Sequence, residues 1–291
     1  MDIEELRKSL KNQNFPSNFT FRYTIEDEKV SVYNNGHEDI ALKKYDSKYL
    51  ALHSGRCFNE IKILENIQHC KTVVELVDSF ITPNDEVFLQ MPFYATGDLE
   101  KFTTVLTMNK QKLTDSQIRQ IMMQLLQTLL FLKSQNIIHR DVKLENIIVK
   151  DVYYQSKTKM FFHIKLIDFE CAVIYDPQFP PQDNVGTNQY KAPEVLTNKP
   201  QDFKVDIWSL ATVLFSMKTN VCFDRNTALR HPAVKRNKKL FNVLNGMLEE
   251  NPLKRLSVEA CINHPWMTNQ KEKGKLKMFL SNIKQKFGIS P

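Results

Sequence analysis

One aspartate of the sequence stands alone inside an apolar run. The stretch KLIDFECAV, residues 165–173, holds Asp168 and, two residues later, Glu170. Burying a carboxylate in such surroundings is costly unless a cation, a metal ion or a hydrogen-bond donor meets it. The stretch therefore marks Asp168 as a candidate ligand, with those three partners as the alternatives.

A second stretch gathers three more polar side chains between apolar, strand-like residues. IIHRDVKLENIIV, residues 137–149, holds Asp141, Lys143 and Asn146 close together. A carboxylate can accept a proton, an ammonium group can offset negative charge, and an amide oxygen is a hard metal ligand. Taken alone, so short a stretch also arises by chance, and its neighbours along the chain decide its meaning.

The pattern H-R-D-x-K-x-x-N in this second stretch resembles the catalytic loop of eukaryotic protein kinases. Further stretches resemble kinase motifs in the order of that family: IALK at 40–43, Glu60 in the following helix, IDFE at 167–170, APE at 192–194, DIWSLA at 206–211 and NPLKRLSVEACINHPWM at 251–267. The resemblance covers about residues 18–268. It implies an α+β, bilobal protein kinase fold, with a small antiparallel β-sheet lobe and one main helix at 18–92, and a larger, mostly helical lobe at 93–268.

The resemblance also implies catalytic roles. Asp141 orients a substrate hydroxyl and accepts its proton, while Lys143 offsets the charge of the transferring phosphoryl group. A lysine two residues after the aspartate resembles serine/threonine kinases rather than tyrosine kinases. Lys43 pairs with Glu60, which holds the lysine against the α- and β-phosphates of ATP. The implied reaction moves the γ-phosphoryl group of ATP to Ser or Thr of a protein.

Metal and adenine sites follow from the same resemblance. The metal ligands are Asn146 and Asp168, with Mg²⁺ as the expected ion and Mn²⁺ as the alternative. Asp168 thereby gains a partner, a divalent cation that bridges ATP phosphates.

The adenine slot is expected between Ala41, above, and Ile148, below. Met91 falls at the gatekeeper position in front of the hinge. Since Pro92 has no backbone N–H to donate, the backbone of Phe93 is the expected adenine partner.

The glycine-rich loop of the family is absent from this sequence. No glycine precedes Gly36, and the turn that should carry the loop holds Glu26, Asp27 and Glu28. Glycines there let backbone N–H groups approach phosphates closely. We expect a short turn held away from the phosphates and weaker nucleotide affinity, unless the strands are placed differently. IDFE resembles the metal-binding DFG motif of kinases, and Glu170 stands in the place of its glycine. We expect the restricted backbone of Glu170 to hold the loop that follows Asp168 in its active arrangement.

The segment after Asp168 lacks the usual phosphorylation sites. Tyr175 is the sole hydroxyl side chain between Asp168 and Gly186. Many kinases order this loop with a phosphothreonine that pairs with the arginine of the catalytic loop, here Arg140. Asp176 or Asp183 can give that arginine a permanent carboxylate partner instead. We therefore predict activity without phosphorylation of the loop.

Substrate preference is indicated by acidic residues. Asp98 and Glu145 match places where basophilic kinases contact arginines of the substrate, while a third such place holds Ser216. Thr187 is expected near Lys143, which favours Ser/Thr substrates. The implied substrate is a basic, Arg-containing protein.

Hydrophobic periodicity predicts the elements that position these groups. Strands are expected at 19–25, 29–33, 39–45, 73–80 and 86–93, and helices at 56–67, from 114 onward and at 206–215. A polar helix opens the 1–17 extension, and the 269–291 tail is predicted to be a basic amphipathic helix that either docks on the domain or binds a partner. Two supporting contacts are also expected. Glu194 should pair with Arg255, and Asp206 should accept backbone N–H groups of the catalytic loop.

Composition limits the class of protein. The 291 residues carry a net charge of +7 with a pI near 9.0, which favours anionic partners. Five scattered cysteines, an N-terminus without an apolar signal segment and the lack of a membrane-length apolar run predict an intracellular, reduced protein without a structural metal or membrane contact. Direct binding of nucleic acid is not expected as the main role, and a homodimer stays open.

Two broader interpretations remain. The compact chain without a glycine-rich loop resembles the late kinases of baculoviruses, which implies a viral setting, host cytoplasm or nucleus, and a basic, DNA-condensing substrate. The alternative to an active kinase is a pseudokinase or scaffold, which the missing glycines and Glu170 favour. Against that alternative, the six residues that bind and transfer phosphate are all present: Lys43, Glu60, Asp141, Lys143, Asn146 and Asp168.

Overall fold

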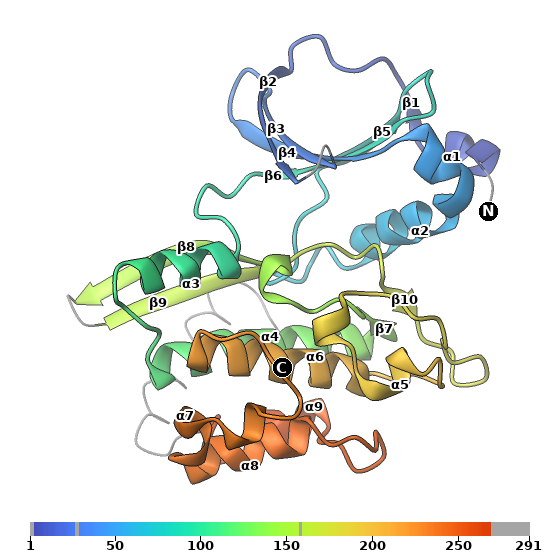
Figure 1. Ribbon diagram of the computed structural model, residues 1–291. Helices are drawn as coiled ribbons and strands as arrows, with labels where there is room; N and C mark the ends of the chain where they lie inside the picture. Colours follow the sequence, from blue (N-terminus) through green and yellow to red (C-terminus); the bar gives the residue numbers. More distant parts are fainter. Residues whose placement is uncertain (1–2, 27–28, 157–158, 269–291) are drawn as a thin grey trace. The chain divides into compact units, whose positions relative to one another are not determined.

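The computed structural model describes residues 3–26, 29–156 and 159–268 (Figure 1). The chain divides into two compact units, each described separately below. The first unit runs to Thr96 and also includes residues 167–172, and the second holds residues 97–166 and those from Val173 on. An α+β fold with two lobes is thus confirmed, whereas the predicted domain boundaries stay predictions. The tail at 269–291 and the acidic turn at 27–28 lie outside the described residues.

The first unit is built on a six-stranded sheet in the order β1-β5-β6-β4-β3-β2. The strands are β1 Lys11–Asn12, β2 Thr20–Glu26, β3 Val30–Asn34, β4 Asp39–Tyr45, β5 Asp78–Ile81 and β6 Val87–Pro92. Neighbouring strands are antiparallel except for the short pair of β1 with β5. The sheet buries Ile40 and Leu42 beside Phe80 and Phe88, whose rings stack 5.2 Å apart. The strands predicted at 19–25, 29–33, 39–45 and 86–93 correspond to β2, β3, β4 and β6.

The expected strand at 73–80 was wrong over most of its length. Only Asp78–Ile81 forms β5, while Val73 donates its N–H to Cys70 in a turn, at 3.1 Å. Val73 and Val74 are nevertheless buried. The apolar residues at the start of this segment are therefore buried without forming a strand. In so short a segment, periodicity cannot distinguish a buried turn from a buried strand.

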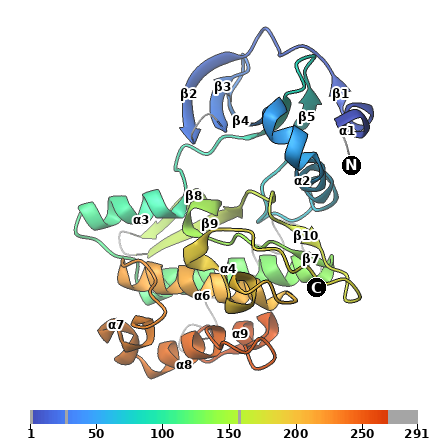
Figure 2. The same cartoon turned by 45° about the vertical axis from the view of Figure 1, so that its right-hand side comes forward.

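The two helices of this unit are α1 Ile3–Ser9 and α2 Ser47–Asn66, and α2 lies beside the sheet (Figures 1 and 2). α2 begins well before the predicted start at Arg56. The Asp46 side chain caps it by accepting the Tyr49 N–H at 2.7 Å. His53 departs from helical angles inside it, with φ −135°, and Gly55 follows two residues later. His53 and Gly55 interrupt the helical pattern of the sequence before Arg56, although the helix itself continues through them.

The second unit is mostly helical. Its helices are α3 Leu99–Met108, α4 Asp115–Ser134, α5 Pro193–Leu196, α6 Lys204–Thr219, α7 Pro232–Lys235, α8 Lys238–Met247 and α9 Val258–Asn263, with 3₁₀ turns η1 Leu144–Asn146, η2 Asn188–Tyr190 and η3 Ala228–Arg230. Thr114 and Gln117 form the predicted capping box at the start of α4. α6 packs against α4 and is buried nearly all round, as its apolar sequence predicts.

Two antiparallel strand pairs in the described part of the second unit flank the catalytic loop. β8 Ile147–Ser156 pairs with β9 Lys159–Leu166, and β7 Ile137–Ile138 pairs with β10 Val173–Ile174. The catalytic loop lies between β7 and β8, so both of its ends are fixed by strand pairing. No helix in the described part of the chain is long and apolar enough to cross a membrane.

Candidate active site

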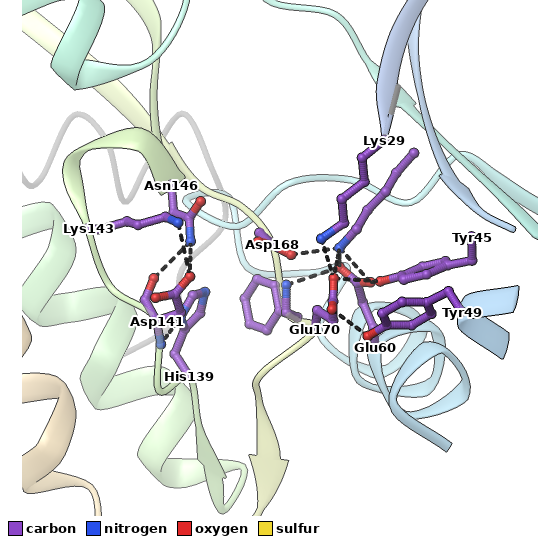
Figure 3. A network of polar contacts seen from close by, with 12 residues as sticks. Lys29, Tyr45, Tyr49, Glu60, His139, Asp141, Lys143, Asn146, Asp168 and Glu170 are labelled. Carbon is purple, nitrogen blue, oxygen red and sulfur yellow. Dashed lines mark hydrogen bonds and ion pairs between the residues drawn. The ribbon is translucent and has the colours of Figure 1, made fainter. Parts of the chain in front are cut away.

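A buried ion pair at the centre of the first unit joins the sheet to α2 (Figure 3). The Lys43 ammonium group on β4 donates to both carboxylate oxygens of Glu60 on α2, each at 2.9 Å. Both side chains are almost fully buried, at 4% and 1% exposure. Lys43 also donates to Oδ1 of Asp168 at 2.6 Å. Although burial alone would lower it, Asp168 and Glu60 raise the pKa of Lys43 well above its usual range, so the lysine is charged.

The segment that carries Asp168 is fixed by the same glutamate. Glu60 Oε1 accepts the backbone N–H of Phe169 at 3.1 Å, and the Phe169 side chain is buried. Asp168 adopts a left-handed backbone conformation, with φ 62°. The lone carboxylate is thus met by a cation of this chain, and its side chain keeps 27% exposure toward a further ligand.

The Glu170 side chain belongs to the same charged cluster, and the expected effect of its backbone on the loop stays a prediction. Its carboxylate accepts hydrogen bonds from Lys29 Nζ and Tyr49 Oη, each at 2.5 Å, and Tyr45 Oη, which donates to Glu60, lies 3.4 Å away. Lys43 Nζ lies 3.5 Å from the same Oε2 atom. Burial would raise it, yet Lys43 and the hydrogen bonds from Lys29 and Tyr49 hold the pKa of Glu170 below its usual value. The left-handed residue of the segment is Asp168, so Glu170 occupies no conformation that needs glycine.

The residues expected around adenine are divided between the units. In the first unit, Ala41 on β4 pairs with Met91 on β6, and Phe93 follows the strand with its ring centroid 6.2 Å from that of Tyr23. Ile148 belongs to β8 of the second unit, where it bridges to Asp98. The slot between Ala41 and Ile148 therefore stays a prediction.

The catalytic loop of the second unit brings its three predicted residues together (Figure 3). Asn146 Nδ2 donates to the backbone oxygen and to Oδ2 of Asp141, at 2.9 and 3.0 Å. Lys143 Nζ lies 3.3 Å from Asp141 Oδ2 and donates to Thr187 Oγ1 at 3.0 Å. The backbone N–H of Thr187 donates to Asp141 Oδ1 at 2.8 Å. The predicted proximity of Thr187 to Lys143 is thus confirmed.

Asp206 supports the loop from the start of α6, as predicted. Its carboxylate accepts the backbone N–H groups of His139 and Arg140, each at 2.8 Å. Burial raises the pKa of Asp206, although His139 and these hydrogen bonds oppose the shift. His139 Nδ1 in turn accepts the Asp141 N–H at 3.2 Å. The backbone that leads into Asp141 is therefore fixed by buried groups.

Gly186 is a positioning residue that sequence reasoning missed. It has φ +89°, and a Cβ atom there would lie 2.4 Å from the backbone oxygen of Arg140 and 3.3 Å from Asp141 Oδ1. The close approach lets the following residue, Thr187, reach Asp141. The only signal in the sequence is an isolated glycine directly before that threonine.

A carboxylate meets the arginine of the catalytic loop. The Arg140 guanidinium donates to Oδ1 of Asp183, while Asp176 accepts a bond from Gln178 within its own turn, at 2.8 Å. Gln201 fixes the Asp183 backbone by donating to its carbonyl at 2.8 Å. Of the two aspartates expected for this role, the structure selects Asp183.

Acidic groups gather beside the catalytic loop around α3. Asp98 caps α3 by accepting the Lys101 N–H at 2.8 Å, and Tyr190 Oη donates to Glu145 at 3.4 Å. Burial, Glu145 and Asp98 raise the pKa of Glu100, which shows that the three carboxylates share one region. Glu100 was not among the predicted residues, because its exposed helical position carries no motif.

The buried Glu194–Arg255 pair confirms another expectation. Arg255 donates to both carboxylate oxygens of Glu194, at 2.5 and 2.8 Å, and to the backbone oxygens of Lys204 and Glu249, each at 2.9 Å. Its side chain is fully buried. This bidentate geometry ties α5 to the loop before α9.

Each unit holds one of the two residues predicted to bind a metal ion. Asn146 donates through its amide nitrogen to Asp141, so its amide oxygen is the atom available as a metal ligand, and Asp168 keeps a partly exposed carboxylate. Among the described residues, no three His, Cys, Asp or Glu side chains form a metal cluster. Each of the two side chains offers a hard oxygen donor of the kind that Mg²⁺ prefers, and their joint role in binding one ion stays a prediction.

The arrangement is typical of protein kinases: a strand lysine is paired with a helix glutamate, an aspartate lies beside them, and a loop joins Asp141, Lys143 and Asn146. Comparison with known proteins agrees. A family model for the protein kinase domain matches residues 30–267. The chain therefore belongs to the protein kinase family, and it is a eukaryotic-type serine/threonine kinase domain.

Its relatives are named as serine/threonine kinases. The chain is 32% identical over 266 residues to serine/threonine-protein kinase cds1 of Schizosaccharomyces pombe, covering 82% of this chain and 55% of that protein. It is 27% identical over 274 residues to mouse serine/threonine-protein kinase D3, covering 88% of this chain and 30% of that protein. It is 34% identical over 160 residues to CLA4 of Candida albicans, covering 55% and 15%. The chain thus spans about half or less of these relatives.

Proposed function

We propose that the chain transfers the γ-phosphoryl group of ATP to Ser or Thr of a basic protein, without prior phosphorylation of its loop. The observation that carries the proposal is the complete set of phosphate-transfer residues, each already held by a partner within its own unit. Lys43 is fixed by Glu60 and Asp168, and Asp141 by Asn146 and the Thr187 backbone. A degraded kinase has no need to hold such costly charges in place.

The residues perform distinct parts of the reaction. Asp141 accepts the proton of the substrate hydroxyl and orients its oxygen. Lys143, which contacts both Asp141 and Thr187, offsets negative charge on the transferring group. Lys43 binds the phosphates of ATP, and Asn146 and Asp168 would hold Mg²⁺. When bound, the metal ion supplies charge neutralisation at the phosphate oxygens.

Independence from loop phosphorylation is supported by the contact of Arg140 with Asp183. A phosphate in this place would give the arginine a negative partner, and Asp183 supplies one permanently. The loop can therefore be ordered as soon as the chain folds. Tyr175 is the residue to test, and Tyr175→Phe should leave kcat unchanged.

Preference for arginine in the substrate is supported by the carboxylates of Glu145 and Glu100. Since Asp98 is engaged at the start of α3 by Lys101, these two glutamates are the better arginine partners. A peptide whose arginines are replaced by alanine should be phosphorylated with a higher KM. The same replacement should matter less to Glu145→Gln than to the parent chain.

The test of the proposal is phosphoryl transfer from labelled ATP and Mg²⁺ to an Arg/Ser-rich peptide, by the parent chain and by Asp141→Asn. Transfer by the parent and its loss in the variant is the expected result. If neither protein transfers phosphate and ATP binding is absent, the chain is a scaffold. The assay is repeated with Mn²⁺ in place of Mg²⁺. Transfer with Mn²⁺ alone shows a metal preference, whereas no transfer with either ion shows a lack of activity.

A further inference from the structure

Lys29 is a second lysine beside the charged cluster of the first unit, which consists of Lys43, Glu60, Asp168 and Glu170. Its backbone oxygen accepts the Lys44 N–H at 2.7 Å, which fixes Lys29 against β4 at the start of the β3 hairpin arm. Its ammonium group reaches Glu170 Oε2 at 2.5 Å, the same oxygen atom that lies 3.5 Å from Lys43 Nζ. Two ammonium groups, one from β4 and one from the residue just before β3, therefore meet at one carboxylate oxygen (Figure 3).

The charge balance of the cluster makes this second cation important. Glu60, Asp168 and Glu170 are three carboxylates that all lie near Lys43. Without Lys29 the cluster would hold one cation against three anions and would repel a phosphate chain. Lys29 compensates the charge that Glu170 adds in place of glycine.

Exposure distinguishes the two lysines. Lys43 has 4% of its side chain exposed and is occupied by Glu60 and Asp168, whereas Lys29 keeps 34% exposure. An incoming anion can reach the Lys29 ammonium group while that group still contacts Glu170, since an ammonium group has three donors.

Without the glycine-rich loop, another group must hold the phosphates of ATP, and a partly exposed cation can do so. In this sequence no glycine precedes Gly36, so side chains hinder close approach of the hairpin backbone to phosphates. A lysine side chain can contact a phosphate from farther away than a backbone N–H group. We infer, on the basis of the proposed function, that Lys29 is a phosphate-binding residue that Glu170 positions, and that it takes the place of the glycine-rich loop in holding ATP.

Tyr49 and Tyr45 keep Glu170 in place for this role. Tyr49 Oη donates to Oε1 and leaves Oε2 to the lysines, while Tyr45 Oη donates to Glu60 and lies 3.4 Å from Glu170 Oε2. The carboxylate is thus oriented from α2 and β4 together, and its orientation fixes where the Lys29 ammonium group lies.

The experiment compares two ligands that differ only in the phosphate chain. Dissociation constants for a non-hydrolysable ATP analogue and for adenosine, both with Mg²⁺, are measured by calorimetry for the parent and for Lys29→Met. Loss of one charge-assisted hydrogen bond should weaken the ATP analogue roughly 10- to 100-fold and leave adenosine within about twofold. Lys29→Arg, which keeps the charge, should restore most of the affinity for the analogue.

Lys44→Met is the matched control. Lys44 is a neighbouring lysine with 38% exposure that pairs with Glu86 at 2.6 Å, and its loss should leave both affinities unchanged. The inference is overturned if Lys29→Met binds the analogue as the parent does, or if affinity for adenosine falls equally. Because binding is measured without turnover, a parent chain that binds the analogue but transfers no phosphate contradicts the proposed function alone. A parent that binds no analogue contradicts both.

Discussion

Replacing Gly186 by alanine tests how closely the catalytic loop must be positioned. A Cβ atom would lie 2.4 Å from the Arg140 backbone oxygen, whereas ordinary contact begins at 3.4 Å. The loop must therefore shift by about 1 Å, next to the residue that accepts the proton, and a shift of that size can cost about 100-fold in rate. The φ of +89° adds strain of roughly 1 kcal/mol for a residue with a side chain.

The assay separates the rate of transfer from stability. For Gly186→Ala we expect kcat to fall roughly 100-fold with little change in the KM for ATP, because the loss falls on the transition state. Gly36→Ala is the control, since Gly36 has φ +95° and a Cβ there meets none of the described atoms within 4 Å. It should lose stability similarly and keep its kcat. A Gly186→Ala protein with kcat within about threefold of the parent, or equal loss in both variants, would refute the positioning role.

Three further perturbations test the supporting contacts. Asp183→Ala should lower kcat/KM roughly tenfold, because Arg140 loses this carboxylate. Unchanged steady-state kinetics would contradict the proposal that Asp183 takes the place of a loop phosphate. Arg255→Met should cost about 3–5 kcal/mol in urea unfolding because the Glu194 carboxylate stays buried, and a loss below about 1 kcal/mol would show that the pair is not needed. The hydrogen bond from Lys133 lowers the pKa of Glu259 from 4.5 to about 2, so its contribution to stability is present above pH 4.5 and lost as the pH falls toward 2. The Tm of the parent should therefore exceed that of Glu259→Gln at pH 6 and match it near pH 2, whereas a difference independent of pH would contradict the assignment.

Local chemistry was predictable from the sequence because its partners lie close along the chain. Asp141 and Asn146 are five positions apart, so the loop that joins them is short enough to read directly. β4 has the predicted ends, Asp39 and Tyr45, because a short apolar run bounded by polar residues is a usable strand signal. The kinase motifs then supplied the pairing of strand lysine and helix glutamate.

Contacts between residues far apart in the chain could not be predicted from the sequence. Lys29 and Glu170 are separated by 141 positions, and Lys29 matches no motif, so nothing in the chain indicated their contact. For the same reason the sequence left Asp176 and Asp183 as equal candidates, because the choice depends on the path of the loop. Glu170 was interpreted through its backbone, whereas the structure places its side chain among two lysines and two tyrosines.

The most direct test of the account is a time course of phosphoryl transfer by chain treated with phosphatase. Mass spectrometry first establishes that Tyr175 and the rest of the loop carry no phosphate. The account predicts immediate transfer to serine or threonine of an Arg-containing peptide, with no lag, and loss of transfer in Asp141→Asn. Transfer that begins only after the loop is phosphorylated, or no transfer at all, would contradict it.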